Sequence, residues 1–175
     1  VVQYRNKTAS PALRREQARG LLDVCNQQGA ILLINDHVDL AAEIDAHGAH
    51  IGGDDGSLEQ ARKCLGPDRI IGVSCYRELA RANAAVEGGA DYIAFGSFYA
   101  SGVKPSAVRA PLSLLTSARA FGVPVVAIGG ITPENAEPLI AAGADAVAVI
   151  SALYAVPDIT AAARKFCQLF EAKRS

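Results

Sequence analysis

The sequence predicts an α/β fold, a (β/α)8 TIM barrel. Short apolar segments alternate with longer amphipathic segments at intervals of roughly 20–25 residues, the spacing of βα units. The apolar segments lack polar alternation, which is typical of parallel strands buried on both faces. About seven such units can be counted, one fewer than the barrel needs. Because the chain opens in the strand-like VVQYRNK without a start methionine, we expect the first strand and helix to be missing before Val1.

The competing architecture is a doubly wound open sheet. That fold usually carries a glycine-rich fingerprint after its first strand, and no such motif follows Val1–Tyr4. The 175 residues are 50% hydrophobic and 20% charged, which suits one domain with a sizeable core. We therefore predict a single barrel domain over residues 1–175.

The predicted elements follow from apolar periodicity, and glycine or proline sets their ends. Gly29, Gly66-Pro67 and Gly88-Gly89 each end a helix, and Ser151–Pro157 is expected to be a turn. The predicted strands are Val1–Tyr4, Ile31–Ile34, Ala49–Ile51, Ile70–Ser74, Tyr92–Phe95, Val123–Ile128 and Ala146–Ile150. The predicted helices are Pro11–Gln28, the amphipathic segment His37–His47, Leu58–Leu65, Glu78–Glu87, Leu112–Ala120, Pro133–Ala142 and Ile159–Lys173.

Composition excludes several function classes. A net charge of -1 gives no overall field that would favour nucleic acid or a membrane surface. No apolar run approaches membrane-spanning length, and no signal peptide is visible. The four cysteines show no CxxC pair, so neither a zinc site nor a disulfide framework is indicated, and a cytoplasmic location is expected. A homo-oligomer is compatible with the sequence.

Acidic residues follow two neighbouring strands of a predicted βαβ unit. Asn35-Asp36 ends the first apolar run and Asp54-Asp55 the second. The connecting helix forces these strands to be parallel, so the acids should lie at one edge of the sheet. Carboxylates that converge repel one another unless a cation joins them, and hard oxygen ligands suit Mg²⁺ with a phosphate-rich substrate.

Structural alternatives exist for these residues. Asp36 is compatible with an N-cap of the following helix, and Asp54-Asp55 with a turn before a helix capped by Ser57. Other strand-end residues are compatible with solvated charges or with core positions. These are Arg5, Lys7, Ser74 and Cys75. The histidines lack metal-ligand spacing and are interpreted as structural or surface residues. They are His37, His47 and His50.

Two later segments supply candidate phosphate ligands. Gly129-Gly130 and Ser151 follow successive strands, as in barrels whose late loops bind phosphate through backbone N–H groups. A plain turn at Gly129-Gly130 is the alternative. The loop FGSFYASGVKP is longer than an ordinary βα connection and carries Lys104, an ammonium suited to phosphate. A surface loop without a function is the alternative there.

Seven segments together resemble the thiamine-phosphate synthase (thiamin phosphate pyrophosphorylase) family. They occur in the family's order and span nearly the whole chain: VQYRNK, LLINDHVDLA, HIGGDD, IIGVSC, YIAFGSFYASGVKP, VVAIGGIT and AVAVIS. The resemblance implies a (β/α)8 barrel. It also implies a transferase that joins 4-amino-5-hydroxymethyl-2-methylpyrimidine pyrophosphate to a thiazole phosphate, releasing pyrophosphate and giving thiamine phosphate.

The resemblance also implies residue roles. The pyrimidine pyrophosphate would be held by Gln3, Arg5, Lys7, Asn35, Ser74 and Lys104, of which Lys7, Ser74 and Lys104 would act on the reacting groups. The thiazole phosphate would be held by Ser101, Gly102, Val103, Gly129, Gly130, Ile150 and Ser151. Asp36 and Asp55 would ligate Mg²⁺. Three residues depart from the family pattern, Gly53, Val103 and Tyr76, where glutamine, threonine and histidine are usual.

The implied chemistry is a dissociative displacement that needs charge stabilisation rather than a general base. Two alternative functions remain. A related thiazole tautomerase transfers a proton with a histidine near the Ser74 strand, where Tyr76 stands here. The second alternative is a non-catalytic barrel, which would bind a phosphate of the thiamine pathway without turnover.

Overall fold

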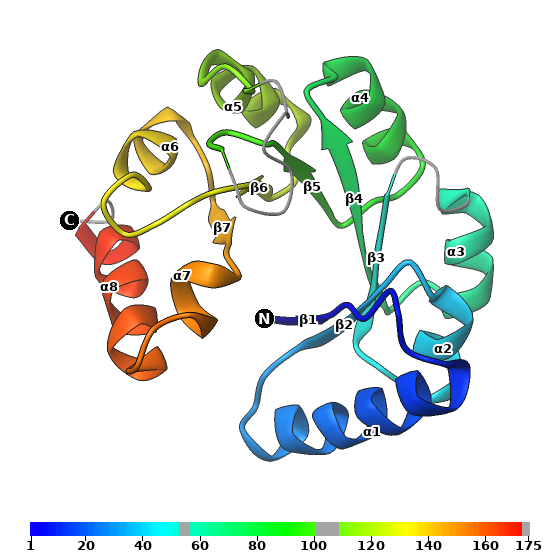
Figure 1. The fold of residues 1–175 in the computed structure, drawn as a ribbon. Coiled ribbons are helices and arrows are strands. Elements are labelled where there is room, and N and C mark those ends of the chain that lie inside the picture. The colour runs from blue at the N-terminus through cyan, green and yellow to red at the C-terminus, as the bar shows by residue number, and fades with distance from the viewer. Residues whose placement is uncertain (53–56, 101–108, 173–175) are drawn as a thin grey trace. The chain divides into compact units, whose positions relative to one another are not determined.

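The structure is a computed structural model that describes residues 1–52, 57–100 and 109–172. Parallel strands alternate with helices along this part of the chain, as the sequence predicts (Figure 1). The described chain divides into two compact units. The first unit is Val1–Ser74 with Glu87–Asp91, and the second is Cys75–Val86 with Tyr92–Ser175.

The first unit is built on four strands that pair in chain order. They are β1 (Val2–Tyr4), β2 (Leu32–Asn35), β3 (Gly48–Ile51) and β4 (Ile70–Tyr76), whose last two residues belong to the second unit. All three pairings are parallel. The helices are α1 (Pro11–Gln27), α2 (Val38–Glu43) and α3 (Leu58–Leu65). In Figure 1, α1 and α2 lie beside these strands, which they contact.

The core of the first unit lies between its strands and helices. Tyr4, Leu32, Ile34 and Ala49 face α1 and α2 and belong to one buried cluster. Since successive side chains of a strand point to opposite faces, the neighbours of these residues along each strand face the other side of the sheet. Asn35 and His50 are such residues, and they are the two buried polar side chains among those described.

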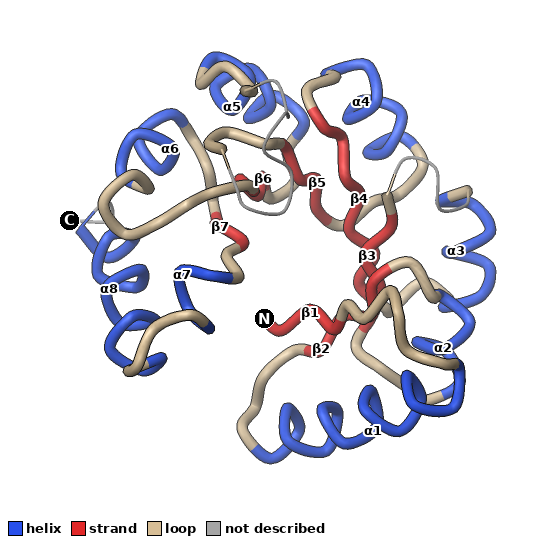
Figure 2. Tube along the Cα trace, viewed as in Figure 1, coloured by secondary structure: helices blue, strands red, loops and turns tan. Residues whose placement is uncertain are grey.

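The second unit contains the parallel strands β5 (Tyr92–Phe95), β6 (Val125–Ile128) and β7 (Ala146–Ala148). Its helices are α4 (Leu79–Glu87, whose last residue belongs to the first unit), α5 (Ser113–Ala118), η1 (Arg119–Phe121), α6 (Glu137–Ala142), α7 (Ser151–Tyr154) and α8 (Ile159–Ala172). As Figure 2 shows, α5 lies beside β6 and α6, and α6 beside α8. The buried residues of β5 and β6 include Ile93, Phe95 and Val125.

Three predicted features of the second unit were wrong. The helix predicted over Pro133–Ala142 begins at Glu137, because the Asn135 side chain folds residues 130–135 into a turn. Ser151–Tyr154 forms the short helix α7 instead of a turn. Burial on both faces fails for β7, whose Ala146 and Ala148 are exposed.

A repeated side-chain contact fixes the start of alternate strands, β2, β4 and β6. The carboxylate of Asp91 accepts the N–H of Ile71 at 2.7 Å, and that of Asp145 accepts the N–H of Val125 at 2.8 Å. In the same way, Nδ1 of His47 accepts the N–H of Leu32 at 3.1 Å. The structural interpretation of His47 is thereby confirmed. Each acceptor directly precedes one strand and accepts an N–H from the first or second residue of the strand before it.

Removing one of these acceptors should destabilise the protein. Val125 is 1% exposed, so Asp145→Leu leaves a buried N–H without its partner and should lower the free energy of unfolding by about 1–3 kcal/mol. Asp145→Asn keeps a carbonyl oxygen and should retain most of the stability. Urea unfolding measures both variants. A leucine variant as stable as wild type would contradict the role of this carboxylate.

Candidate active site

Predicted site residues of the first unit lie at the carboxyl ends of its strands. In the register of the sheet, Gln3 pairs with Leu33 and Asn35 with His50. Arg5 directly follows β1, Asp36 directly follows β2, and Ser74 lies near the end of β4. Because parallel strands end at one edge of a sheet, this edge carries two amide side chains together with one cationic, one acidic and one hydroxyl side chain. Gln3 and Arg5 are exposed, and Asn35 is buried.

Lys7 and Asp36 form an ion pair at this edge. The Nζ of Lys7 lies 3.4 Å from Oδ2 of Asp36, and the two side chains are 56% and 18% exposed. Asp36 has a left-handed backbone with φ of 64°, a conformation that aspartate tolerates better than most residues. Its N–H donates to the carbonyl of His50 at 2.9 Å, which fixes this turn to β3.

The capping interpretation of Asp36 is wrong. The N-cap of α2 is His37, and no side chain caps that helix. The Asp36 carboxylate is therefore turned to Lys7 rather than to the helix. By contrast, Ser57 does cap α3, since its hydroxyl accepts the N–H of Gln60 at 3.1 Å.

The donor chemistry around Asp36 fits a hard cation. The Asp36 carboxylate offers an oxygen donor of the kind that Mg²⁺ prefers, and Asn35, the preceding residue, carries an amide oxygen. Within the described ranges, no three His, Cys, Asp or Glu side chains lie close enough to hold a metal. Asp55, the second predicted ligand, lies outside the described residues, as do Ser101, Gly102, Val103 and Lys104.

Sequence reasoning missed a contact between His50 and Ser74. Nε2 of His50 lies 2.8 Å from Oγ of Ser74. His50 is 8% exposed, so the surface interpretation of this residue is wrong. The signal was present in the sequence, because Ala49 and Ile51 are apolar and period two turns His50 to the opposite face. Ser74 is half-buried, and the core alternative holds only for its neighbour Cys75.

Cys75 is buried on β4, and burial raises the pKa of its thiol to about 11. A pKa above its usual range keeps the thiol protonated at neutral pH, so Cys75 is a poor nucleophile. We expect iodoacetamide at pH 8 to label the exposed Cys64 and Cys167 while sparing Cys75. Mass spectrometry before and after unfolding in urea measures this. Labelling of folded Cys75 at the rate of Cys64 would contradict the prediction.

In the second unit, Tyr76 ends β4 in a strained conformation. Its φ is 53°, and its carbonyl accepts the N–H of Gly96 at 2.9 Å. The guanidinium carbon of Arg81 lies 5.3 Å from the centre of the Tyr76 ring, within the range of a cation–π contact. Tyr76 is 38% exposed, so this one of the three residues that depart from the family pattern is fixed in place and accessible.

The Gly129-Gly130 loop is packed tightly against residues 97–100. A Cβ on Gly129 would lie 2.0 Å from Oγ of Ser97, and one on Gly130 would lie 2.3 Å from the carbonyl oxygen of Ala100. Both glycines also have positive φ, 96° and 63°. Both positions therefore need glycine for close packing against residues 97–100, whereas their role in binding phosphate stays a prediction.

Polar contacts hold this loop in shape. Asn135 donates from Nδ2 to the carbonyl of Gly130 at 3.1 Å, and its Oδ1 accepts the N–H of Thr132 at 2.8 Å. The hydroxyl of Tyr99 donates to the carbonyl of Asn135 at 2.7 Å. Neither Tyr99 nor Asn135 belongs to a pattern that would mark it in the sequence as a loop-shaping residue.

The other two thiazole-side residues predicted in this unit follow β7. Ile150 is 63% exposed and Ser151 begins α7. Their roles, like those of Gly129 and Gly130, stay predictions.

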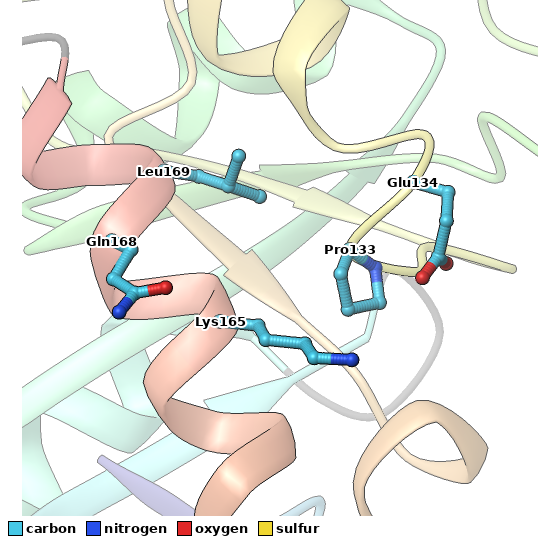
Figure 3. Close-up of a pocket in the computed structure, with 5 residues that line it drawn as sticks. All are labelled: Pro133, Glu134, Lys165, Gln168 and Leu169. Carbon is cyan, nitrogen blue, oxygen red and sulfur yellow. The ribbon is translucent and has the colours of Figure 1, made fainter.

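Figure 3 shows a separate pocket in the second unit, between the loop after β6 and α8. It has a volume of about 300 Å³ and is lined by Pro133, Glu134, Lys165, Gln168 and Leu169. Hydrogen bonding to Thr132 and the positive charge of Lys165 lower the pKa of Glu134. None of the predicted site residues lines this pocket.

Comparison with known proteins agrees with the pattern of residues. The family described as "Thiamine monophosphate synthase" matches residues 1–153. A thiamine-phosphate synthase of Methylobacillus flagellatus is 54% identical over 169 residues, covering 97% of this chain and 81% of that protein. One of Nitrosomonas eutropha is 52% identical over 170 residues, covering 97% and 80%.

A solved structure agrees as well. Thiamine phosphate pyrophosphorylase from Pyrococcus furiosus superposes with a TM-score of 0.86 at 32% identity, covering 97% of this chain and 82% of that one. No helix in the described part of the chain has both the length and the apolar character to cross a membrane. From its family match and these relatives, the chain belongs to the thiamine monophosphate synthase family and is a transferase of thiamine biosynthesis.

Proposed function

We propose that the protein couples 4-amino-5-hydroxymethyl-2-methylpyrimidine pyrophosphate to a thiazole phosphate, giving thiamine phosphate and pyrophosphate. The observation that carries the proposal is the strand-end edge of the first unit, where Lys7 pairs with Asp36 at 3.4 Å. Arg5 and Asn35 lie at the ends of the adjacent strands β1 and β2. A diphosphate bound beside cations and hydrogen-bond donors leaves more readily, since its developing charge is stabilised.

In this proposal each residue of the site has a separate role. Arg5 and Lys7 offset the charge of the leaving diphosphate, and the Ser74 hydroxyl donates to one of its oxygens. Gln3 and Asn35 orient the pyrimidine diphosphate through their amides. Lys104 is proposed to act on the same diphosphate.

Backbone amides at the loops after β6 and β7 are proposed to bind the phosphate of the thiazole. Gly129, Gly130, Ile150 and Ser151, with residues 101–103, supply this side of the site. No proton-transfer residue is required, because the thiazole nitrogen attacks a carbon that the aminopyrimidine ring supports as a cation.

We propose that Asp36 and Asp55 hold one Mg²⁺. The fit rests on the carboxylate of Asp36, which no helix cap engages. The bound ion would neutralise part of the diphosphate charge. We also propose that the parallel strands belong to a (β/α)8 barrel, in keeping with the TM-score of 0.86 to the Pyrococcus furiosus protein.

Incubation with both substrates tests the proposal. Thiamine phosphate and pyrophosphate should appear in equal amounts with Mg²⁺, and a chelator should suppress both. Binding of either substrate without product would favour the non-catalytic alternative. Conversion of the thiazole alone into its tautomer, without coupling, would favour the tautomerase, an alternative that the buried His50 beside Ser74 keeps open.

A further inference from the structure

We infer that His50 is a positioning residue that fixes the Ser74 hydroxyl as a hydrogen-bond donor to the diphosphate. His50 is 8% exposed and its Nε2 lies 2.8 Å from Oγ of Ser74. The inference rests on the proposed function, because it assumes an anionic diphosphate as the ligand of Ser74.

The sheet directs the imidazole toward Ser74. His50 pairs in register with Gly72 on β4, and Ser74 lies two residues beyond Gly72 on the same face. Gly72 carries no side chain, so the ring can pass over it. The same residue holds Asp36 through its backbone, since its carbonyl accepts the Asp36 N–H at 2.9 Å. His50 therefore connects the predicted metal ligand with the predicted diphosphate ligand.

Hydrogen-bond valence sets the direction of the contact. A serine hydroxyl has one hydrogen to donate and accepts with its oxygen, whereas a diphosphate oxygen accepts only. If Ser74 donated to His50, its hydrogen would be unavailable to the diphosphate. If Nε2–H of His50 donates to Oγ, the hydroxyl hydrogen is free to point at the ligand. This direction requires Nε2 of the imidazole to carry a hydrogen.

A set of five variants tests this role: Ser74→Ala, His50→Leu, His50→Gln, His50→Glu and the double variant S74A/H50L. We expect Ser74→Ala and His50→Leu each to lower kcat by about 10–100-fold, the effect of losing one hydrogen bond to a charged group. The KM for the thiazole phosphate should stay within about 2-fold, since the interaction is made with the other substrate. A merely structural role would not separate kcat from KM in this way.

Coupling and rescue decide the outcome. In the Ser74→Ala background, His50→Leu should cost no further activity beyond about 3-fold, because the hydroxyl it positions is absent. Gln places a donor nitrogen near the position of Nε2 and should restore kcat to within about 5-fold of wild type. Glu only accepts, so it should not rescue. A full additional loss in the double variant, no rescue by Gln, or activity retained with Glu would each overturn the inference.

Binding of inorganic pyrophosphate separates this inference from the proposed function. Calorimetry with Mg²⁺ present should rank the variants by pyrophosphate affinity as kcat ranks them. Wild type and His50→Gln should bind tightly, and His50→Leu and Ser74→Ala should bind more weakly by about 10-fold or more. If the wild-type protein made no thiamine phosphate, the proposed function would be refuted. The pyrophosphate dissociation constants would still test the role of His50. Equal pyrophosphate affinity in His50→Leu and wild type would overturn the role of His50.

Discussion

Replacing Asp36 by asparagine should reduce thiamine phosphate synthesis by about 100-fold or more, the cost typical of removing an electrostatic contact made at the reacting charge. Asn keeps the shape of the side chain and tolerates the left-handed backbone, whose φ is 64° here. The variant should therefore fold as wild type does, and its loss would reflect the missing carboxylate. Initial rates at saturating Mg²⁺ and substrates measure the effect.

Asp39 provides the matched control. It is an exposed acid in the first turn of α2, three residues from Asp36. Asp39→Asn removes the same charge from the same helix end, and we expect its rate to stay within about 2-fold of wild type, as is usual for surface substitutions. Equal losses in both variants would contradict a specific role for Asp36.

A second comparison separates two explanations for the loss in Asp36→Asn. Asp36 lies 3.4 Å from the ammonium of Lys7. The carboxylate therefore acts either by positioning that ammonium or by ligating Mg²⁺. If it ligates Mg²⁺, Asp36→Asn should raise the Mg²⁺ concentration that gives half-maximal rate, and Lys7→Gln should not. If it only positions Lys7, both variants should leave that concentration unchanged and the double variant should lose no more than either single one.

Much of the architecture was predictable because each strand has its own local signal. Uninterrupted apolar runs mark parallel strands, and Leu58–Leu65 and Tyr92–Phe95 have the predicted bounds. Errors occur where a side chain overrides local propensity. Asn135 ties Gly130 and Thr132 into a turn, which delays α6 to Glu137, although Pro133 is a common first residue of a helix.

The candidate site was predictable in part for the same reason. Strand ends locate Arg5, Asn35, Asp36 and Ser74, and parallel pairing gathers them at one edge. The contact between His50 and Ser74 depends on register between strands that are 24 residues apart. Rules based on the spacing of histidines along the chain do not detect pairs that form across strands. The sequence alone therefore assigned no functional role to His50.

Close approach rather than backbone freedom should make Gly130 indispensable. Gly130→Ala places a Cβ 2.3 Å from the carbonyl oxygen of Ala100, a backbone atom that moves only with its segment. The expected result is displacement of the loop after β6, a loss of stability of about 2 kcal/mol or more, and weaker binding of the thiazole phosphate. Urea unfolding and the KM for the thiazole phosphate measure the two effects.

Gly122→Ala isolates the contribution of backbone conformation. Gly122 has a φ of 72°, close to the 63° of Gly130, but no atom lies within 4 Å of its added Cβ. Both variants therefore carry the left-handed strain of about 1 kcal/mol, and only Gly130→Ala adds the clash. We expect Gly122→Ala to keep the wild-type KM. If the two variants lose equal stability and Gly130→Ala also keeps its KM, the contact with Ala100 does not shape the phosphate loop, and the glycine serves only to permit the turn.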